Sequence, residues 1–469
     1  MLPCLPALVA LALSQAAPPE PPAPPQAALE QPLPSPPAPE EAGGVPTRRY
    51  LIESIEFRGL AKTRPEAVRR HIFIEEGEIL DPQRVLLSRL GLLQLGWFSS
   101  VEPRVERGSE RGKVKVVFEV VERNTLVVTD LIFGSTKPQP LYGGLALSEQ
   151  NFAGQGLGLS GGALYGGSPD GRSTDSRYSL RAGFYAPDLR VRDLRLVLGF
   201  QVISIQGDEL TCSDVKCSQF VGNYVNAPRA HYSRQGGDFQ FGIRPGPFER
   251  LTGTYTLEKL HATLDNGLAP GVGPYILVGS STLAGITGSY EVETRDDFFY
   301  PTDGFRAIGQ VTFASKLVGS DYEFSRYLLQ AETAYELFRI PLRLQTALGA
   351  VQGNAPFFDR FYGADYSYFA IGPALGRAME LNFSTDSRYD AFLFMGGLEY
   401  AIPLWTGGAA PFHRAYVALG ARYVWSSATL GGGRTTFSTI PFSFDVALRL
   451  DTVIGSFNLS LGYALDNAL

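Results

Sequence analysis

From about residue 125 to the end of the chain, apolar and polar side chains alternate in one segment after another. Because successive side chains of a β-strand point to opposite faces, each segment predicts a strand with one apolar and one polar face. After the N-terminus the sequence contains no run of about 18 apolar residues, the length that a membrane-spanning helix needs. The clearest alternation lies close to the C-terminus, where the apolar positions are Phe457, Leu459, Leu461, Tyr463 and Leu465.

This alternation predicts an antiparallel transmembrane β-barrel over residues 124–469, with lipid on one side of each strand and a polar lumen on the other. The charged fraction of 19%, below the roughly 25% of soluble domains, agrees with that class. Closed bacterial barrels favour even strand numbers, so we expect about 16 strands. A soluble β-sandwich is the alternative, but it fits poorly with so many segments and long polar loops. We identify fifteen strand segments: 126–134, 141–149, 156–167, 175–186, 194–206, 230–243, 249–264, 283–295, 305–315, 321–337, 342–353, 390–402, 415–426, 442–452 and 456–465.

The N-terminal 47 residues have the composition of a leader followed by a tether. In residues 1–16 an apolar stretch precedes Ser14-Gln15-Ala16, which predicts a signal peptide, although no Lys or Arg precedes the stretch. A short membrane anchor is the alternative, but the stretch is too short to span a bilayer. Residues 17–47 are rich in proline, alanine and glutamate, which predicts an extended linker, either a solvated tether or a ligand for a periplasmic partner.

The sequence offers little to support catalysis or a cofactor. Cys212 and Cys217 are close enough in sequence to pair as a loop disulfide in an oxidising compartment, and the four histidines are scattered. Residues 156–162 match two glycine motifs of enzymes, but both motifs need a strand–turn–helix setting, and this segment continues as a strand. We therefore expect no enzyme activity and no cofactor, and the net charge of -6 gives no indication of a nucleic-acid partner.

Residues 48–123 predict a separate small domain with the element order β-α-α-β-β. Strand patterns cover residues 50–58, 101–107 and 113–122. The first helix is predicted by a capping box from Thr63 to Glu66, and the second by a cap at Asp81 followed by a proline. The second helix is expected to bury the face that carries Leu86, Leu90 and Leu93.

This domain resembles a polypeptide-transport-associated (POTRA) domain in three sequence motifs, which in chain order are I-E-F-R-G-L, G-E-I-L-D-P and L-G-W-F-S-S-V. The resemblance implies an exposed sheet edge that binds an extended client by adding a strand. We expect that edge either at residues 50–57 or along the segment that carries Val114, Val116, Phe118 and Val120.

The barrel segment resembles the BamA/TamA outer-membrane assembly superfamily, of the bacterial surface antigen type. The resemblance rests on S-E-Q-N-F-A-G-Q-G at residues 148–156, on T-R-D-D-F-F-Y-P-T-D-G-F-R at 294–306 and on F-F-D-R-F-Y-G-A-D at 357–365. The second motif predicts a tight structural turn, and its residues of interest are Asp296, Asp297, Pro301, Asp303 and Gly304.

The third motif resembles the start of the family's long sixth loop, which folds back into the lumen and ends in an Arg-Gly-aromatic tip. This chain reads Tyr366-Ser367-Tyr368-Phe369 there, so the tip is absent or displaced. Arg377 is the nearest substitute, and a surface arginine is the alternative. The candidates for this loop are Arg360, Phe361, Tyr362, Gly363 and Arg377.

The resemblance implies a transport or assembly function without chemistry: insertion of β-barrel proteins into the outer membrane, or passage of a chain across it. Its site would be a weakly paired seam between the first and last strands, here Leu126 and Val128 against Phe457, Leu459 and Leu461. The implied partners are unfolded outer-membrane or secreted clients, periplasmic accessory proteins and membrane lipids. The family also has one more strand after a segment like 455–465.

Two other functions remain open at this point. A two-partner secretion transporter usually carries two POTRA domains and a plug helix, whereas this sequence shows one POTRA-like domain. A passive outer-membrane channel or structural barrel, with the small domain used only for docking, is the other alternative. A fully paired seam and an open lumen would indicate the passive channel.

Overall fold

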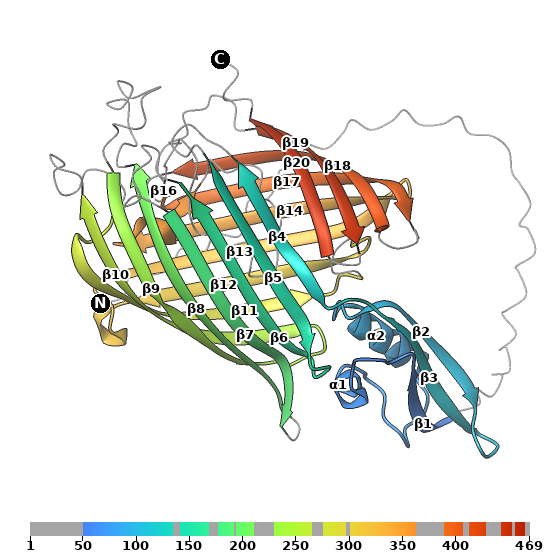
Figure 1. Cartoon of the computed structure of the whole chain (residues 1–469). Helices are drawn as coiled ribbons and strands as arrows, with labels where there is room; N and C mark the ends of the chain where they lie inside the picture. Colours follow the sequence, from blue (N-terminus) through green and yellow to red (C-terminus); the bar gives the residue numbers. More distant parts are fainter. Residues whose placement is uncertain are drawn as a thin grey trace, which may run out of the picture. The chain divides into compact units, whose positions relative to one another are not determined.

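The residues that the structure describes form an N-terminal α+β domain and one large antiparallel sheet (Figure 1). The structure is a computed structural model of the chain, and it describes residues 50–134, 141–167, 177–191, 194–210, 229–264, 275–296, 301–362, 389–406, 412–427, 442–452 and 455–464. Several predictions from the sequence lie outside these residues: the leader, the linker, Asp297, Gly363, Arg377, Cys212 and Cys217.

The N-terminal domain contains a three-stranded sheet and two helices in the predicted order. Its sheet has the strand order β1-β3-β2, with β1 parallel and β2 antiparallel to β3. Helices and strands together bury an apolar core that includes Ile52, Val68, Leu92, Trp97 and Phe118. The elements are β1 (Leu51–Arg58), α1 (Pro65–Arg69), α2 (Pro82–Leu93), β2 (Phe98–Arg107) and β3 (Lys113–Glu122).

The two helices begin differently. Helix α2 starts as predicted, because the side chain of Asp81 accepts a hydrogen bond from the Gln83 N–H. The predicted capping box of α1 is wrong: the N-cap is Arg64, no side chain caps the helix, and Pro65 is its first residue. The predicted buried face of α2 is also wrong, since Leu86 is exposed and Leu90 and Leu93 are half-buried, whereas Val85 and Leu92 are buried.

The large sheet contains fifteen strands, and each corresponds to one of the fifteen predicted segments. Consecutive strands pair antiparallel in sequence order, so the chain runs up and down around a barrel (Figure 1). Short turns join the strands at one end, here called the turn end, and longer connections join them at the other, the loop end. The strands are β4 (Leu126–Gly134), β5 (Tyr142–Phe152), β6 (Leu157–Gly166), β7 (Arg177–Val191), β8 (Leu194–Leu210), β9 (Arg229–Ile243), β10 (Glu249–Leu264), β11 (Gly279–Glu293), β12 (Gly304–Ala314), β13 (Phe324–Leu337), β14 (Ile340–Gly353), β17 (Phe392–Thr406), β18 (Phe412–Ser427), β19 (Phe442–Thr452) and β20 (Gly455–Ala464).

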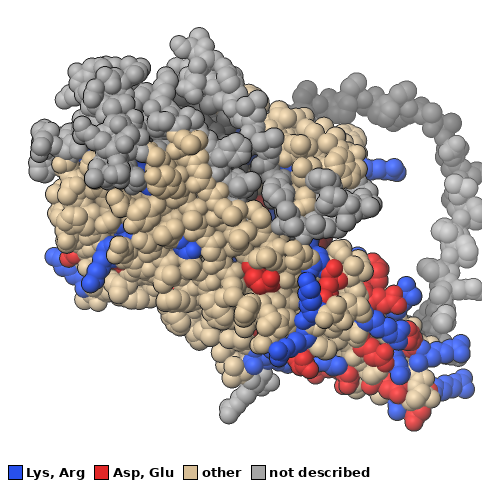
Figure 2. All heavy atoms as spheres, viewed as in Figure 1, with Lys and Arg blue, Asp and Glu red and all other residues tan. Residues whose placement is uncertain are grey.

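The two faces of this sheet differ in chemistry as the alternation predicts. Outward-facing residues of the strands are large, apolar and exposed, for example Leu251, Tyr255 and Leu257 of β10. Figure 2 shows the contrast: acidic and basic side chains gather over the domain of β1 to β3, while the barrel wall in this view is largely uncharged. An apolar outer face of this kind suits contact with lipid. Among the described residues, no helix is long and apolar enough to cross a membrane.

Candidate functional site

The two end strands of the sheet, β4 and β20, lie beside each other without a backbone ladder between them among the described residues (Figure 1). Every other pair of neighbours in the sheet is joined by a ladder. An end strand presents a row of backbone N–H and C=O groups that no partner strand satisfies. The seam between β4 and β20 is therefore the place where a further strand could pair with this sheet.

The predicted seam residues lie in these two end strands. Leu126 faces outward and is half-exposed, and Val128 is half-buried next to a register shift that precedes Asp130. Such a bulge bends a strand and disturbs its pairing locally. On the other side of the seam, Phe457, Leu459 and Leu461 belong to β20, where they pair with Leu450, Leu448 and Val446 of β19.

A second candidate element is the turn between β5 and β6, which holds the N-terminal domain within the compact unit Arg49–Leu469. The Asn151 side chain is buried there, and its amide donates to the Thr63 hydroxyl at 2.9 Å. Its carbonyl oxygen accepts from the Gly156 N–H at 2.8 Å. One buried amide thus closes its own turn and binds the domain that precedes the barrel.

Backbone contacts extend this junction. The Arg64 N–H donates to the Gly154 carbonyl at 2.9 Å, and the Trp97 indole N–H donates to the Gln150 carbonyl at 3.2 Å. A Cβ at Gly156 would lie 2.6 Å from the Trp97 ring, and the φ of Gly156 is +74°. Only glycine fits that position without displacement of the ring. In the predicted N-F-A-G-Q-G motif, Gly156 therefore leaves room for the Trp97 ring, and Gly154 leaves room for the Lys62 carbonyl.

Two more turns contact the same domain. The Gln94 amide donates to the carbonyl oxygens of Glu293 and Arg295, at 3.3 and 2.9 Å, at the end of β11. Between β9 and β10, the ring of Phe248 lies 6.1 Å from the ring of Phe73. Together with the β5–β6 turn, these contacts spread the junction across the turn end of the barrel.

A buried histidine completes the junction. His71 Nδ1 lies 3.5 Å from an Asp188 carboxylate oxygen in β7, and the Arg195 guanidinium pairs with the same carboxylate. Burial lowers the pKa of His71 to about 3, and the opposing effect of Asp188 is too small to offset it. His71 is therefore neutral at neutral pH while the junction is formed.

The sheet of the N-terminal domain has a different edge from the one predicted. The prediction that Val114, Val116, Phe118 and Val120 form a free edge is wrong. Their strand, β3, is central because it pairs with β1 on one side and β2 on the other. All four side chains are buried in the domain core, which explains their apolar character.

The alternative edge, at residues 50–57 in β1, is covered by the chain that follows α1. The Ile52 N–H donates to the Glu78 carbonyl at 2.8 Å, and the Leu80 N–H donates to the Tyr50 carbonyl at 2.7 Å. The Ile55 N–H is capped by the Glu76 carboxylate at 3.1 Å. Few backbone groups of this edge are left to pair with a further strand.

Strand β2 offers the accessible edge, since among the described residues it pairs with β3 alone. Its Val101 carbonyl accepts from the Arg89 side chain at 2.9 Å, and Pro103 has no N–H to offer. Val105, further along, is exposed. The C-terminal half of β2, next to Val105, is therefore the part of this edge that is open to pairing with a further strand.

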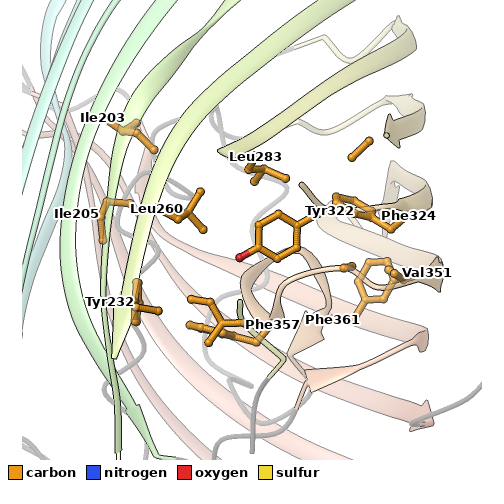
Figure 3. Close-up of a cluster of buried hydrophobic side chains, with 14 of the residues drawn as sticks. Ile203, Ile205, Tyr232, Leu260, Leu283, Tyr322, Phe324, Val351, Phe357 and Phe361 are labelled. Atoms are coloured by element: carbon orange, nitrogen blue, oxygen red, sulfur yellow. The ribbon is translucent and has the colours of Figure 1, made fainter. Parts of the chain in front are cut away.

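Inside the barrel, an apolar cluster lies at the loop end (Figure 3). Tyr322 is fully buried in it, and its hydroxyl accepts from the Leu277 N–H at 3.2 Å. The ring of Phe357 lies 5.1 Å from the ring of Tyr232, which belongs to β9. Other members come from nine further strands of the wall and include Ile205, Leu260, Leu283, Phe324, Val351 and Leu393.

The start of the predicted sixth loop supplies part of this cluster. Residues Phe357–Asp359 form a 3₁₀ turn, and Phe361–Tyr362 (β15) pairs with Tyr389–Asp390 (β16). Phe361 is buried in the cluster, and the Arg360 side chain donates to the Ala355 carbonyl at 3.3 Å. The stem of this loop therefore lies inside the barrel, and its aromatic residues fill the interior at that level.

Nearer the turn end, the inner face carries a continuous chain of alternating arginines and glutamates. In six contacts between successive members, a guanidinium nitrogen lies 2.7 to 3.3 Å from a carboxylate oxygen. Glu332 is completely buried at its centre, between Arg295 and Arg343. Loss of one partner from such a chain leaves an uncompensated buried charge, which costs about 3–5 kcal/mol. The members of this belt, in order, are Arg250, Glu291, Arg306, Glu293, Arg295, Glu332, Arg343, Glu399 and Arg449.

The predicted acidic turn has a structural role. The Asp296 carboxylate accepts from the Thr302 N–H at 2.8 Å and from the Asp303 N–H at 3.1 Å, so it caps the turn that returns the chain into β12. Pro301 is buried beside it, and Gly304 has a φ of +98°. A Cβ at Gly304 would lie 2.5 Å from the Thr294 carbonyl oxygen, so the turn requires glycine there.

A barrel with an apolar outer face, a seam without a ladder along its described residues and a preceding β-α-α-β-β domain defines an outer-membrane β-barrel protein with a POTRA domain. The chain belongs to the Omp85 superfamily, whose domain matches residues 151–468. The POTRA family, described as a surface antigen variable number repeat, matches residues 50–123. Membership confirms the predicted superfamily, and the outer membrane is the compartment of this chain.

The chain is also similar to individual proteins. A putative outer membrane protein assembly factor of Treponema pallidum is 29% identical over 126 residues, which are 26% of this chain and 15% of that relative. The chain therefore spans a small part of this relative. CdiB from Escherichia coli has a similar fold, with a TM-score of 0.57 and 11% identity over 89% of this chain and 73% of that one. BamA from Haemophilus ducreyi lacking POTRA domains 1–3 aligns over 89% of this chain and 81% of that one, with a TM-score of 0.47 and 17% identity.

Proposed function

We propose that this protein inserts β-barrel proteins into the outer membrane, or passes polypeptides across it, by pairing a client strand with the seam between β4 and β20. The observation that carries this proposal is the pair of adjacent end strands that share no ladder among the described residues. Unsatisfied backbone groups are costly in hydrocarbon, so a client strand that pairs with either edge is stabilised. The folding of the client in the membrane supplies the driving force, and no cofactor or enzymatic step is involved.

The POTRA domain, on the periplasmic side, would receive the client first. Its accessible edge is β2 near Val105, and strand addition there holds the client extended. The chain between β3 and β4 is only three residues long, so a client on this domain is held close to the start of β4. The Treponema pallidum relative is described as a putative assembly factor, which supports the same activity here.

A passive channel is the competing function, and the interior argues against it. The apolar cluster around Tyr322 and Phe357 lies at the loop end of the barrel interior. An ion needs a water-filled path, and buried aromatic side chains do not provide one. Export of one dedicated protein, as in two-partner secretion, shares the seam and differs in its client.

The test locks the seam in full-length protein whose native cysteines are replaced by serine. Val127 faces the inner side of β4, so Val127→Cys is combined in turn with Ser456→Cys, Asn458→Cys or Ser460→Cys of β20. The control pair, Ala447→Cys with Ser460→Cys, lies on opposite positions of a fully paired ladder. The control disulfide joins directly opposed residues of one ladder, and each seam pair joins the two end strands that lie beside each other.

Liposomes with each variant receive an unfolded barrel client, and its folding is followed by protease protection. We expect an oxidised seam pair to slow client folding roughly tenfold, to the rate of empty liposomes, and a reductant to restore it. The oxidised control pair should fold the client as fast as the unmodified protein. Equal client folding with the seam locked and unlocked would contradict the proposal, as would steady ion conductance without any acceleration of folding.

A further inference from the structure

Two protruding apolar side chains flank strand β13. Leu317 is 98% exposed in the 3₁₀ turn Lys316–Val318, which precedes β13 at the loop end. Phe338 is 85% exposed in the turn that follows β13 at the turn end. Each stands beside an exposed cationic residue, Lys316 in the first turn and Arg339 in the second. These are the two most exposed large apolar side chains among the residues that the structure describes.

The Phe338 turn has an unfavourable sequence for its backbone. Leu337 pairs with Ile340, so only Phe338 and Arg339 lie between the strands, with φ values of 53° and 65°. A two-residue hairpin turn with positive φ at both positions favours Asn-Gly. Bulky residues are strained in this conformation, so the turn geometry does not explain Phe-Arg at these positions. Their side chains therefore point to a role outside the hairpin.

The Leu317 turn lies against the outer wall of the barrel. The hydroxyl of Tyr255, an outward-facing residue of β10, donates to the Val318 carbonyl at 3.1 Å. This bond holds the turn on the side of the wall that faces lipid. Leu317, at the tip, then projects from the outer wall instead of into the interior.

An apolar stripe connects the two tips along the outer face of β13. Its members are exposed and outward-facing: Tyr327, Leu329, Tyr335 and Leu337. Fourteen residues of strand at about 3.3 Å each, tilted by about 40°, cross roughly 35 Å of membrane. A bilayer has a hydrocarbon core of about 30 Å and a thickness of about 40–45 Å with its headgroups. The tips at the two ends of this stripe therefore reach the two headgroup regions.

We propose that Lys316-Leu317 and Phe338-Arg339 are lipid anchors at the two membrane surfaces. Leu317 and Phe338 would enter the border of the acyl chains, and Lys316 and Arg339 would bind the lipid phosphates. Aromatic and cationic residues are typical of this interface. Continuity with the lipid-facing stripe favours lipid over a protein partner for both tips.

The anchors lie on the wall away from the seam, since four strands separate β13 from β20 and eight separate it from β4. They fix the height of this wall in the bilayer. This assignment is independent of which client the barrel handles.

Nitroxide labels on cysteines test the proposal in the full chain, reconstituted in phospholipid vesicles with its native cysteines replaced by serine. Labels at Phe338→Cys and Leu317→Cys are compared with a lipid control, Leu329→Cys, and a water control, Leu86→Cys on the POTRA domain. The measured quantity is the ratio of accessibility to oxygen over accessibility to a water-soluble nickel chelate. We expect the ratio at both tips to lie between the controls, roughly threefold above that at Leu86. A ratio at Phe338 equal to that at Leu86 would overturn the lipid assignment and indicate a soluble partner for that tip.

A second variant tests whether Phe338 and Arg339 anchor the barrel wall in the membrane or only form the hairpin turn. Phe338→Asn with Arg339→Gly installs the favoured turn sequence, so the hairpin folds at least as well. If the tip sets the height of the wall, the depth reported by the Leu329 label shifts in this background. An unchanged depth together with normal folding would overturn the anchoring role.

Discussion

At Asn151, one amide side chain serves two parts of the molecule. It accepts from Gly156 within its own turn and donates to Thr63 of the POTRA domain. Thr63 is buried and Gly156 is half-buried, so loss of either hydrogen bond leaves a polar group poorly satisfied. This residue therefore couples the shape of the β5–β6 turn to the position of the preceding domain.

Asn151→Ala should weaken the junction by about 1–2 kcal/mol, because it leaves the Thr63 hydroxyl and the Gly156 N–H without their partner. The measurement is the rate of trypsin cleavage at Arg123, between the POTRA domain and β4, in protein held in nanodiscs. We expect faster cleavage in this variant and an unchanged rate in Gln155→Ala, a neighbour in the same turn. Equal rates in both variants would contradict the role given to Asn151.

The sequence predicted the glycine-rich motif around Asn151 but not its use. Thr63 reads as a helix cap, because a threonine three residues before a glutamate is a common capping pattern. In the structure its hydroxyl is taken by Asn151, 88 residues further along the chain, and α1 begins without a side-chain cap. Local patterns carry no information about a partner so far away in sequence.

At the scale of elements, the strand order of the POTRA sheet decides which edge a client can use. β3 is last in the sequence of the domain but central in its sheet, because β1 pairs with it in parallel. Its apolar residues therefore indicate a central strand that packs on the domain core and not an exposed edge. The order of strands depends on a crossover through both helices, which alternation within one strand cannot reveal.

A photo-crosslinking amino acid at Val105 should capture an unfolded client, because β2 is the accessible edge of this sheet. The same probe at Val121, an exposed position of the central strand β3, serves as the control and should capture little. Mass spectrometry of the adducts reports the yield at each position. Equal yields at the two positions would indicate non-specific binding of the client and would argue against strand addition.

The barrel strands were predictable because each one repeats the same two-residue pattern. All fifteen segments correspond to strands of one sheet, with bounds that differ by a few residues. Helix α2 was harder, since leucines at Leu86, Leu90 and Leu93 mark one apolar face while the core uses Val85 and Leu92. The ion-pair belt was not predicted, although arginine and glutamate recur at inward positions of neighbouring strands. Its register across strands depends on turns that are far apart in sequence.

At the scale of the whole molecule, the POTRA domain contacts four turns or strand ends of the barrel, and one of the contacts is titratable. His71 is buried beside Asp188, with Arg195, Arg244 and Arg70 also facing it. Burial lowers the pKa of His71 to about 3, below the 6.5 of a free imidazole. When the domain is released, His71 becomes exposed to water and takes up a proton below about pH 6.5. The buried ring stays neutral at the same pH. Acidification therefore favours release of the domain.

We expect the junction to lose about 1.4 kcal/mol of stability per pH unit below about pH 6.5, until the pH approaches the lowered pKa. Spin-label distances between the POTRA domain and the barrel, measured from pH 7.5 to pH 5, check this expectation. His71→Gln, which cannot titrate, should show a nearly flat response over the same range. A wild-type distance distribution that does not change down to pH 5 would contradict the role of His71.

The central claim is that β4 and β20 do not form a closed ladder, and amide hydrogen exchange in nanodiscs tests it most directly. Strands β10 and β11 are paired on both sides and set the level of full protection, while β19 controls for proximity to the seam. We predict that amides of β4 and β20 exchange roughly tenfold or more faster than those of β10, β11 and β19. Protection of β4 and β20 equal to that of β10 and β11 would show a closed seam and would contradict the account.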